Sequence, residues 1–155
     1  MTGKYLRDKG VKIIIGVDVI EEALEAVNRD RPNIYNKYYI EDLSNVTPNI
    51  YKELENIDFN SLVCASALNH VPVSAFALAY NLIENNGWIA LNFSCDGFKQ
   101  AAVKLVNQII EQGMLKIKTQ HDYQHRLTVT GNPIMYTGIV GQKLADIPNN
   151  LYLLS

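Results

Sequence analysis

Short apolar runs and longer amphipathic segments, in which hydrophobic and polar positions are mixed, alternate along the chain. Residues 11–17 form a nearly continuous, β-branched run, which is typical of a strand covered on both faces. After Asp18, apolar residues at positions 20, 23, 24 and 27 follow helical spacing, with Glu21 and Glu22 in the first turn, where the helix dipole favours acids. This pattern predicts a strand, an acid and a helix in close succession.

The same alternation continues to the end of the chain. We expect a helix to stop at Gly10, and a long helix to lie between Asp96 at its N-cap and Gly113 after its last turn. Strands that alternate with helices predict a parallel α/β sheet with right-handed crossovers, and two final strands with no helix between them predict an antiparallel hairpin. The expected strands cover residues 37–40, 59–65, 88–93, 115–120 and 135–140, and the expected helices cover residues 48–54, 74–84 and 98–110.

The chain has 155 residues, of which 48% are apolar, and a formal net charge of −2. This composition excludes a disordered chain and predicts one domain, which we place at residues 1–145 with a C-terminal tail at 146–155. Fourteen basic residues against sixteen acidic ones argue against a nucleic-acid partner. Because no apolar run is long enough to span a membrane and no secretory signal is present, we expect a cytoplasmic protein with Cys64 and Cys95 reduced.

Two acids follow neighbouring predicted strands, at the position where parallel sheets bind ligands. Asp18 is either a carboxylate that accepts hydrogen bonds from the paired hydroxyls of a ribose or the N-cap of the helix that follows. Asp42 is suited to an exocyclic amine such as that of adenine, or it is a turn residue. If both acids bind a ligand, they border a single crevice.

Histidine and tyrosine supply the other candidates. His70, in the loop after the strand at 59–65, is either a general base or substrate contact or a loop residue with a structural hydrogen bond. His121 and His125 lie four residues apart without an HExxH motif, so we expect no metal site. No GxGxxG or GxxxxGK[ST] motif occurs. Three further side chains either face a substrate or belong to sheet-edge packing and solvated charge: Tyr123, Arg126 and Tyr136.

The order of these segments resembles class I S-adenosylmethionine (SAM)-dependent methyltransferases. Residues 11–26 (VKIIIGVDVIEEALEA) resemble the second strand and helix of that family, and residues 40–43 (IEDL) its adenine-contacting acidic turn. Residues 59–71 (FNSLVCASALNHV) resemble the fourth strand and its loop, and residues 86–93 (NGWIALNF) the glycine turn and fifth strand. Within the class, residues 3–144 most resemble the small methyltransferases related to the Williams–Beuren region protein.

The resemblance implies a Rossmann-like fold with a mostly parallel sheet, SAM as cofactor, and a set of residues that bind it. In that family Asp18 would hold the ribose hydroxyls, the apolar pair after it would line the adenine, and Asp42 with the next residue would meet the adenine edge. Two residues at the end of the fourth strand would lie beneath the methionine part, and His70 falls in the loop that faces the substrate. The implied cofactor-binding set is Gly3, Asp18, Val19, Ile20, Asp42, Leu43, Ala65 and Ser66.

The beginning of the chain departs from the family pattern. Family members open with a strand and a glycine-rich turn of the form DxGxGTG, whereas this sequence begins Met1-Thr2-Gly3 and matches only the last Thr-Gly. By this resemblance, we expect the first strand of the methyltransferase fold, which is central in the family's sheet, to be missing. Its loss leaves backbone groups of two neighbouring strands unpaired. We expect an altered or incomplete sheet, or a homodimer that compensates for the missing strand.

Three functions are compatible with the sequence. The first is SAM-dependent methylation of a small molecule whose identity the sequence does not give. The second is an inactive methyltransferase-like fragment or partner subunit, which the absent glycine-rich turn favours. The third is NAD binding, which shares Asp18 but also needs a glycine-rich turn before the same helix. The sequence leaves open whether the chain is an enzyme.

Overall fold

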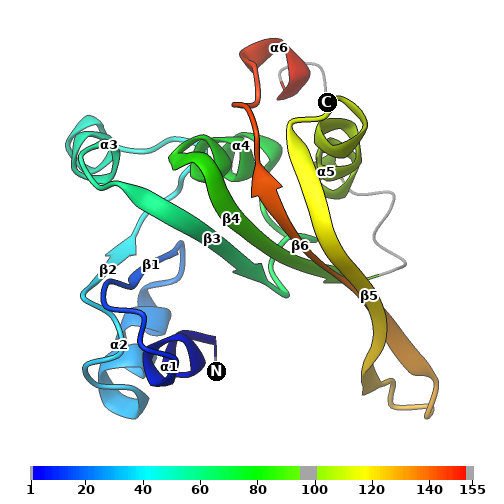
Figure 1. Ribbon diagram of the computed structural model, residues 1–155. Helices are drawn as coiled ribbons and strands as arrows, with labels where there is room; N and C mark the ends of the chain where they lie inside the picture. Colours follow the sequence, from blue (N-terminus) through cyan, green and yellow to red (C-terminus); the bar gives the residue numbers. More distant parts are fainter. Residues whose placement is uncertain (1, 95–100, 153–155) are drawn as a thin grey trace. The chain divides into compact units, whose positions relative to one another are not determined.

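The computed structural model describes residues 2–94 and 101–152, and its elements alternate between helices and strands (Figure 1). The chain divides into two compact units, Met1–Thr47 (unit 1) and Pro48–Ser155 (unit 2). No helix in the described part of the chain combines the length and the apolar character needed to cross a membrane.

Unit 1 holds α1 (Thr2–Asp8), β1 (Ile15–Asp18), α2 (Glu21–Asp30) and β2 (Lys37–Ile40). β1 and β2 pair in parallel, with Asp18 opposite Ile40. The Arg7 guanidinium fastens α1 to the loop before β2, because it donates to the Ile34 carbonyl at 2.6 Å and to Asn36 Oδ1 at 2.8 Å. Asn36 Oδ1 also accepts from the backbone N–H of Ile14 at 2.8 Å, so the loop before β2 is tied to the residue that precedes β1.

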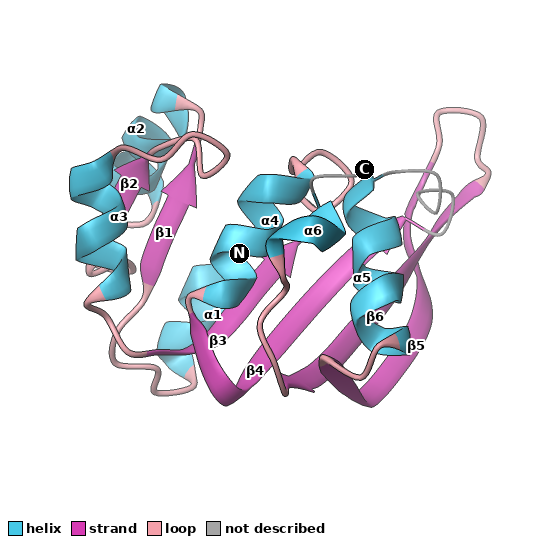
Figure 2. Ribbon diagram, turned by 90° about the horizontal axis from the view of Figure 1, so that it is seen from above, coloured by secondary structure: helices cyan, strands magenta, loops and turns pink. Residues whose placement is uncertain are grey.

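Unit 2 contains a four-stranded sheet with the order β3-β4-β6-β5. β3 and β4 are parallel, and β6 runs antiparallel to both of its neighbours, so every strand of this sheet except β6 points the same way. The helices α4, α5 and α6 lie over one face of the sheet (Figure 2). The elements are α3 (Pro48–Glu55), β3 (Phe59–Ala65), α4 (Val73–Asn81), β4 (Ile83–Ser94), α5 (Ala101–Glu111), β5 (Leu115–Leu127), β6 (Pro133–Lys143) and α6 (Asn149–Tyr152).

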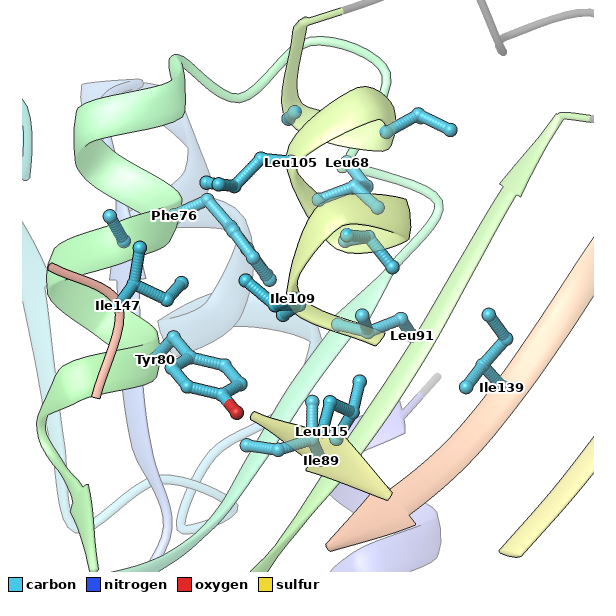
Figure 3. Packing of buried hydrophobic residues seen from close by; sticks show 14 of the residues in the cluster. Leu68, Phe76, Tyr80, Ile89, Leu91, Leu105, Ile109, Leu115, Ile139 and Ile147 are labelled. Atoms are coloured by element: carbon cyan, nitrogen blue, oxygen red, sulfur yellow. The ribbon is translucent and has the colours of Figure 1, made fainter. Parts of the chain in front are cut away.

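The core of unit 2 lies between α4, α5 and the helix-covered face of the sheet (Figure 3). Phe76 and Tyr80 of α4 and Ile109 of α5 are almost completely buried there. The Tyr80 hydroxyl donates to the Met114 carbonyl at 2.9 Å, which satisfies the polar atom of an otherwise apolar side chain. After α5, Gly113 adopts a positive φ of 73°, and the chain turns directly into β5, as predicted for this glycine.

The described strands form two sheets, one of two strands in unit 1 and one of four strands in unit 2. This division agrees with the prediction of an altered or incomplete sheet. The mixed α/β architecture, the mostly parallel strand direction and the C-terminal antiparallel hairpin of β5 and β6 are confirmed. The predicted strands at 37–40 and 59–65 have the observed bounds.

Several predicted boundaries were wrong. The strand expected from residue 11 begins at Ile15, and the side chain of Ile13 is 66% exposed, so this apolar run is not covered on both faces. The helix expected to reach residue 84 ends at Asn81, and β4 begins at Ile83 and passes through Gly87. A Cβ on Gly87 would lie 2.8 Å from the Asn60 carbonyl oxygen, so the glycine allows β3 and β4 to approach closely. Gly87 lies within β4 and does not form a turn before it. Asp96, the predicted N-cap, lies outside the described residues.

Residues beyond 145, predicted as a tail, belong to unit 2. Ile147 is 1% exposed and joins the core cluster. Its backbone N–H donates to Asn81 Oδ1 at 2.8 Å, and Asn81 Nδ2 donates to its carbonyl at 2.9 Å. This reciprocal pair fixes the segment after β6 against the end of α4.

Lys143 of β6 is a buried cation, 1% exposed, that holds the end of α4. Its ammonium group donates to the carbonyls of Asn81 at 3.1 Å and Ile83 at 2.5 Å and pairs with Asp146 at 2.5 Å. We expect Lys143→Ala to lower the free energy of unfolding by about 2–4 kcal/mol, because it leaves buried acceptors without a donor.

Urea unfolding of the full chain, followed by circular dichroism, measures this loss. Lys116→Ala removes an exposed lysine from β5 and is the matched control, which should change stability by less than about 0.5 kcal/mol. Equal effects of the two substitutions would contradict a structural role for Lys143.

Candidate functional site

The carboxyl ends of β1 and β2 bring the two predicted acids to one edge of unit 1. The parallel register places Asp18 opposite Ile40, and Asp42 comes two residues later. The Glu41 backbone N–H donates to the Asp18 carbonyl at 2.8 Å, so the pairing continues to the start of the acidic turn. Both acids therefore lie at the same edge of the two-stranded sheet.

Asp18 does not cap the helix that follows it, which excludes one of its two interpretations. The N-cap of α2 is Ile20, and no side chain caps it. Asp18 Oδ1 accepts from the Ile20 N–H at 3.1 Å, and Oδ2 accepts from the Tyr38 hydroxyl at a long 3.4 Å. Because a carboxylate has about four acceptor positions, Asp18 keeps capacity for two further donors.

Tyr38 forms the side of the site next to Asp18. Burial of its ring, with a further contribution from the Asp18 charge, raises the pKa of Tyr38 to about 12. Its hydroxyl therefore stays protonated at neutral pH and donates to Asp18. The ring also occupies the space where Gly16 has no side chain, since a Cβ on Gly16 would lie 2.2 Å from Tyr38 Cδ2. Any larger residue at position 16 would displace the ring from Asp18.

Asp42 has a different environment. Its Oδ1 accepts from the Ser44 hydroxyl and from the Ser44 backbone N–H, the latter at 2.8 Å. These bonds, the one from the hydroxyl first, lower the pKa of Asp42 below its usual value, so the acid is ionised at neutral pH. Within the described residues no hydrogen bond engages its other oxygen, and the side chain is exposed.

Apolar side chains accompany the acids. Val19 is 65% exposed and Ile20 is 54% exposed, and they follow Asp18 directly. Large apolar residues exposed beside two acceptors provide a surface for a flat ring with polar edges. Leu43, after Asp42, is half-buried. Gly3 of α1 packs closely against Tyr35, because a Cβ at this position would lie 2.7 Å from the Tyr35 hydroxyl oxygen.

The unit 2 candidates lie at the carboxyl end of β3. Ala65 ends the strand, and Ser66 adopts a left-handed conformation with φ of 59°. The Ser66 N–H donates to the side-chain oxygen of Asn92 on β4, which fixes this strained turn. His70 is exposed in the loop that follows, and its backbone N–H donates to the Ala67 carbonyl at 2.8 Å.

Sequence reasoning missed the amides that organise this end of unit 2. Asn92 Nδ2 donates to the Tyr123 hydroxyl at 2.6 Å, so one amide links the turn after β3 to β5. Asn69 Oδ1 accepts from the Ser94 N–H at 3.0 Å and holds the loop after β3 against the end of β4. A polar Asn92 inside the apolar run WIALNF was the signal that could have identified this link.

The remaining described candidates lie on β3, β5 and β6. No group of three His, Cys, Asp or Glu side chains in the described ranges is arranged to hold a metal ion. His125 stacks on Tyr136 with ring centroids 4.2 Å apart. Cys64 is a free thiol, and burial raises its pKa to about 11, so it is protonated and unreactive at neutral pH. Cys95 lies outside the described residues.

The two hydrogen bonds that Ser44 donates determine how the Asp42 carboxyl group is expected to titrate. Because they lower its pKa in the folded state, Asp42 contributes stability that is present above the pKa of the unfolded chain and is lost as pH falls through the lowered value. Ser44→Ala removes the hydroxyl but keeps the backbone donor, so the pKa of Asp42 should rise part of the way to its usual value. Carboxyl ¹³C NMR titration measures the shift. Ser61→Ala is the control, and an unchanged Asp42 pKa in Ser44→Ala would contradict this account.

Comparisons with known proteins identify the fold. No protein-family model and no curated protein matches the sequence. Among solved structures, a SAM-dependent methyltransferase from Methanosarcina mazei is 14% identical, with 92% of this chain and 87% of that chain covered and a TM-score of 0.62. The N-methyltransferase NodS from Bradyrhizobium japonicum is 11% identical, with 92% and 81% covered and a TM-score of 0.62. An rRNA methylase from Streptococcus thermophilus is 15% identical, with 86% and 74% covered and a TM-score of 0.53. The chain therefore has the fold of class I SAM-dependent methyltransferases.

Proposed function

We propose that this protein is a SAM-dependent methyltransferase that acts on a small molecule. The observation that carries the proposal is the parallel register of β1 and β2, which brings Asp18 and Asp42 to one edge of unit 1. Two acceptors at the carboxyl edge of parallel strands suit a nucleoside, because such edges are where open α/β sheets bind ligands. The fold shared with SAM-dependent methyltransferases supports the same cofactor.

The donor and acceptor pattern of unit 1 fits the adenosine part of SAM. Asp18 has acceptor capacity left for the two ribose hydroxyls, and the second oxygen of Asp42 is available to an exocyclic amine. Val19 and Ile20 expose apolar surface beside them for the adenine ring. Gly3, Leu43, Ala65 and Ser66 remain predicted cofactor contacts from the family resemblance.

Methyl transfer requires little covalent chemistry from the protein. Bound SAM supplies a methyl group on a positively charged sulfur. The chain's residues then hold the acceptor in line with that methyl group and exclude water. His70 is a candidate substrate contact, supported by its exposed position in the loop after β3. The net charge of −2 favours a small-molecule acceptor over nucleic acid. We place this activity in the cytoplasm.

The adenosine assignment predicts the effect of removing each carboxylate charge. Asp18→Asn and Asp42→Asn should each weaken SAM binding about 10- to 100-fold, because each loses hydrogen bonds to a charged acceptor. Isothermal titration calorimetry of the full chain with SAM measures the dissociation constant. Asp58→Asn, which neutralises an exposed acid before β3, should leave it unchanged. No heat from the unmodified chain at millimolar SAM would favour an inactive methyltransferase-like fold instead.

We also propose that the chain forms a homodimer through β3. This strand pairs with β4 alone among the described residues, and it contains no charged residue or proline, which are the features that block pairing at sheet edges. An antiparallel pairing of two β3 strands about a twofold axis at Leu62 would place no like charges opposite one another.

Sedimentation equilibrium over a range of protein concentrations tests this proposal. We expect a dimer that Ser61→Lys dissociates, because the lysines of two copies repel each other near the axis. Gln112→Lys adds the same charge after α5 and should leave the dimer intact. A monomer at every concentration would overturn the proposal.

A further inference from the structure

The four-stranded sheet of unit 2 has a groove on the face opposite α4 and α5. Successive side chains of a strand point to opposite faces, so Ile89 and Leu91 enter the core while Ala90 and Asn92 point away from it. The groove has a volume of about 360 Å³, and its apolar surface includes Val63 of β3, Ala90 of β4 and Val140 of β6. A cavity of this size is within the range of small-molecule sites, roughly 300–1,000 Å³.

The side chains that line the groove favour an uncharged ligand. No described residue that lines it is a lysine, arginine, aspartate or glutamate, so a carboxylate or phosphate would find no fixed counter-charge there. A wide apolar floor with a few polar groups at its side is the usual composition of a pocket for a flat organic molecule. Ala65, which the family resemblance places beneath the methionine part of SAM, belongs to this floor.

Tyr123 provides an oriented hydrogen-bond donor at the groove. Its hydroxyl oxygen accepts from Asn92 Nδ2 at 2.6 Å, which leaves the hydroxyl proton available to a ligand. Asn92 is fixed in turn, because its Oδ1 accepts from the Ser66 N–H. The Tyr123 ring packs 6.3 Å from the Tyr136 ring, so the hydroxyl is held on two sides.

His121 provides a proton acceptor in the same groove. It lies on β5 opposite Gly138, and its exposed imidazole has no hydrogen bond or ion pair with any described residue. A ring nitrogen of an imidazole can accept a hydrogen bond or a proton. His121 precedes Tyr123 by two residues on β5, so the same face of the strand presents an acceptor and a donor to the groove.

We propose that this groove binds the methyl acceptor, a flat, uncharged molecule that carries a hydroxyl or amino group. Tyr123 donates a hydrogen bond to that group, and His121 takes its proton. The acceptor's oxygen or nitrogen bonds to the methyl carbon as the carbon–sulfur bond of SAM breaks, and the electron pair of that bond stays on sulfur. The acceptor proton passes to His121 and then to water. This step rests on the proposed function, whereas binding in the groove does not require SAM.

The binding part of the proposal is tested with 2-naphthol, a fluorescent, uncharged, flat molecule with one hydroxyl. Gly138→Leu should weaken its binding to the full chain by at least about tenfold, because the added side chain fills the groove. The backbone has room for a Cβ at this position, since it would meet its nearest neighbours, the His121 carbonyl and Tyr123 Cε1, at an ordinary 3.7 Å, and circular dichroism of the variant checks its fold. Tyr123→Phe should weaken binding about three- to tenfold by removing one hydrogen bond.

His125 is the matched control for His121, because it lies on the same strand but does not line the groove. The NMR signals of the His121 imidazole should shift when 2-naphthol is added, and those of His125 should not. With SAM present, His121→Gln should lower kcat for formation of 2-methoxynaphthalene by about 10²- to 10⁴-fold with little change in KM. His125→Gln should keep both constants.

The outcomes separate this proposal from the proposed function. Equal 2-naphthol affinity in the unmodified chain and Gly138→Leu would overturn the groove assignment, while SAM titration would still test the proposed function. If 2-naphthol binds in the groove and SAM does not bind, the proposed function fails and the ligand site stands. If both bind and no methylated product forms, His121 is not the proton acceptor. A dimer that Gly138→Leu dissociates, without 2-naphthol binding, would assign this face to protein contact and overturn the proposal.

Discussion

Parallel strand pairing is the constraint on which this protein's candidate chemistry depends. Two parallel neighbours end at the same edge, so the segment after Asp18 of β1 must lie beside the segment after Ile40 of β2. The hydrogen bond from Glu41 to the Asp18 carbonyl carries this pairing into the acidic turn. Two acids that are more than twenty residues apart in sequence are thereby brought to the same edge of the sheet, and the apolar residues that follow Asp18, Val19 and Ile20, are exposed.

A second consequence of the strand order is that each unit organises its own ligand-facing surface. Unit 1 presents carboxylates with well-defined partners, Tyr38 for Asp18 and Ser44 for Asp42. Unit 2 presents an uncharged groove, with Asn92 linking the turn at Ser66 to Tyr123. The first surface is the one proposed to bind the polar edges of a nucleoside, and the second is the one proposed to bind a neutral acceptor.

The sequence predicted the elements better than their ends. The strands at 37–40 and 59–65 were predicted with the observed bounds, because polar residues flank their apolar runs. Periodicity did not show that β1 starts only at Ile15, since Val11 and Ile13 are β-branched yet exposed, and the strand begins where β2 is available to pair. The link from Asn92 to Tyr123 joins residues 31 apart, and no local pattern encodes which tyrosine an internal asparagine will meet. The position of Asp18 and Asp42 at the carboxyl ends of two adjacent parallel strands was predictable from the sequence, because it depends only on the strand order.

The most direct test of the account is an amide NMR titration of the full chain with SAM. The backbone N–H groups of Ile20 and Ser44 donate to Asp18 and Asp42, so they report on both carboxylates at once. If adenosine binds at this edge, both amide signals should shift together and saturate at the same SAM concentration. If SAM binds while neither signal moves, the two acids do not form the nucleoside site.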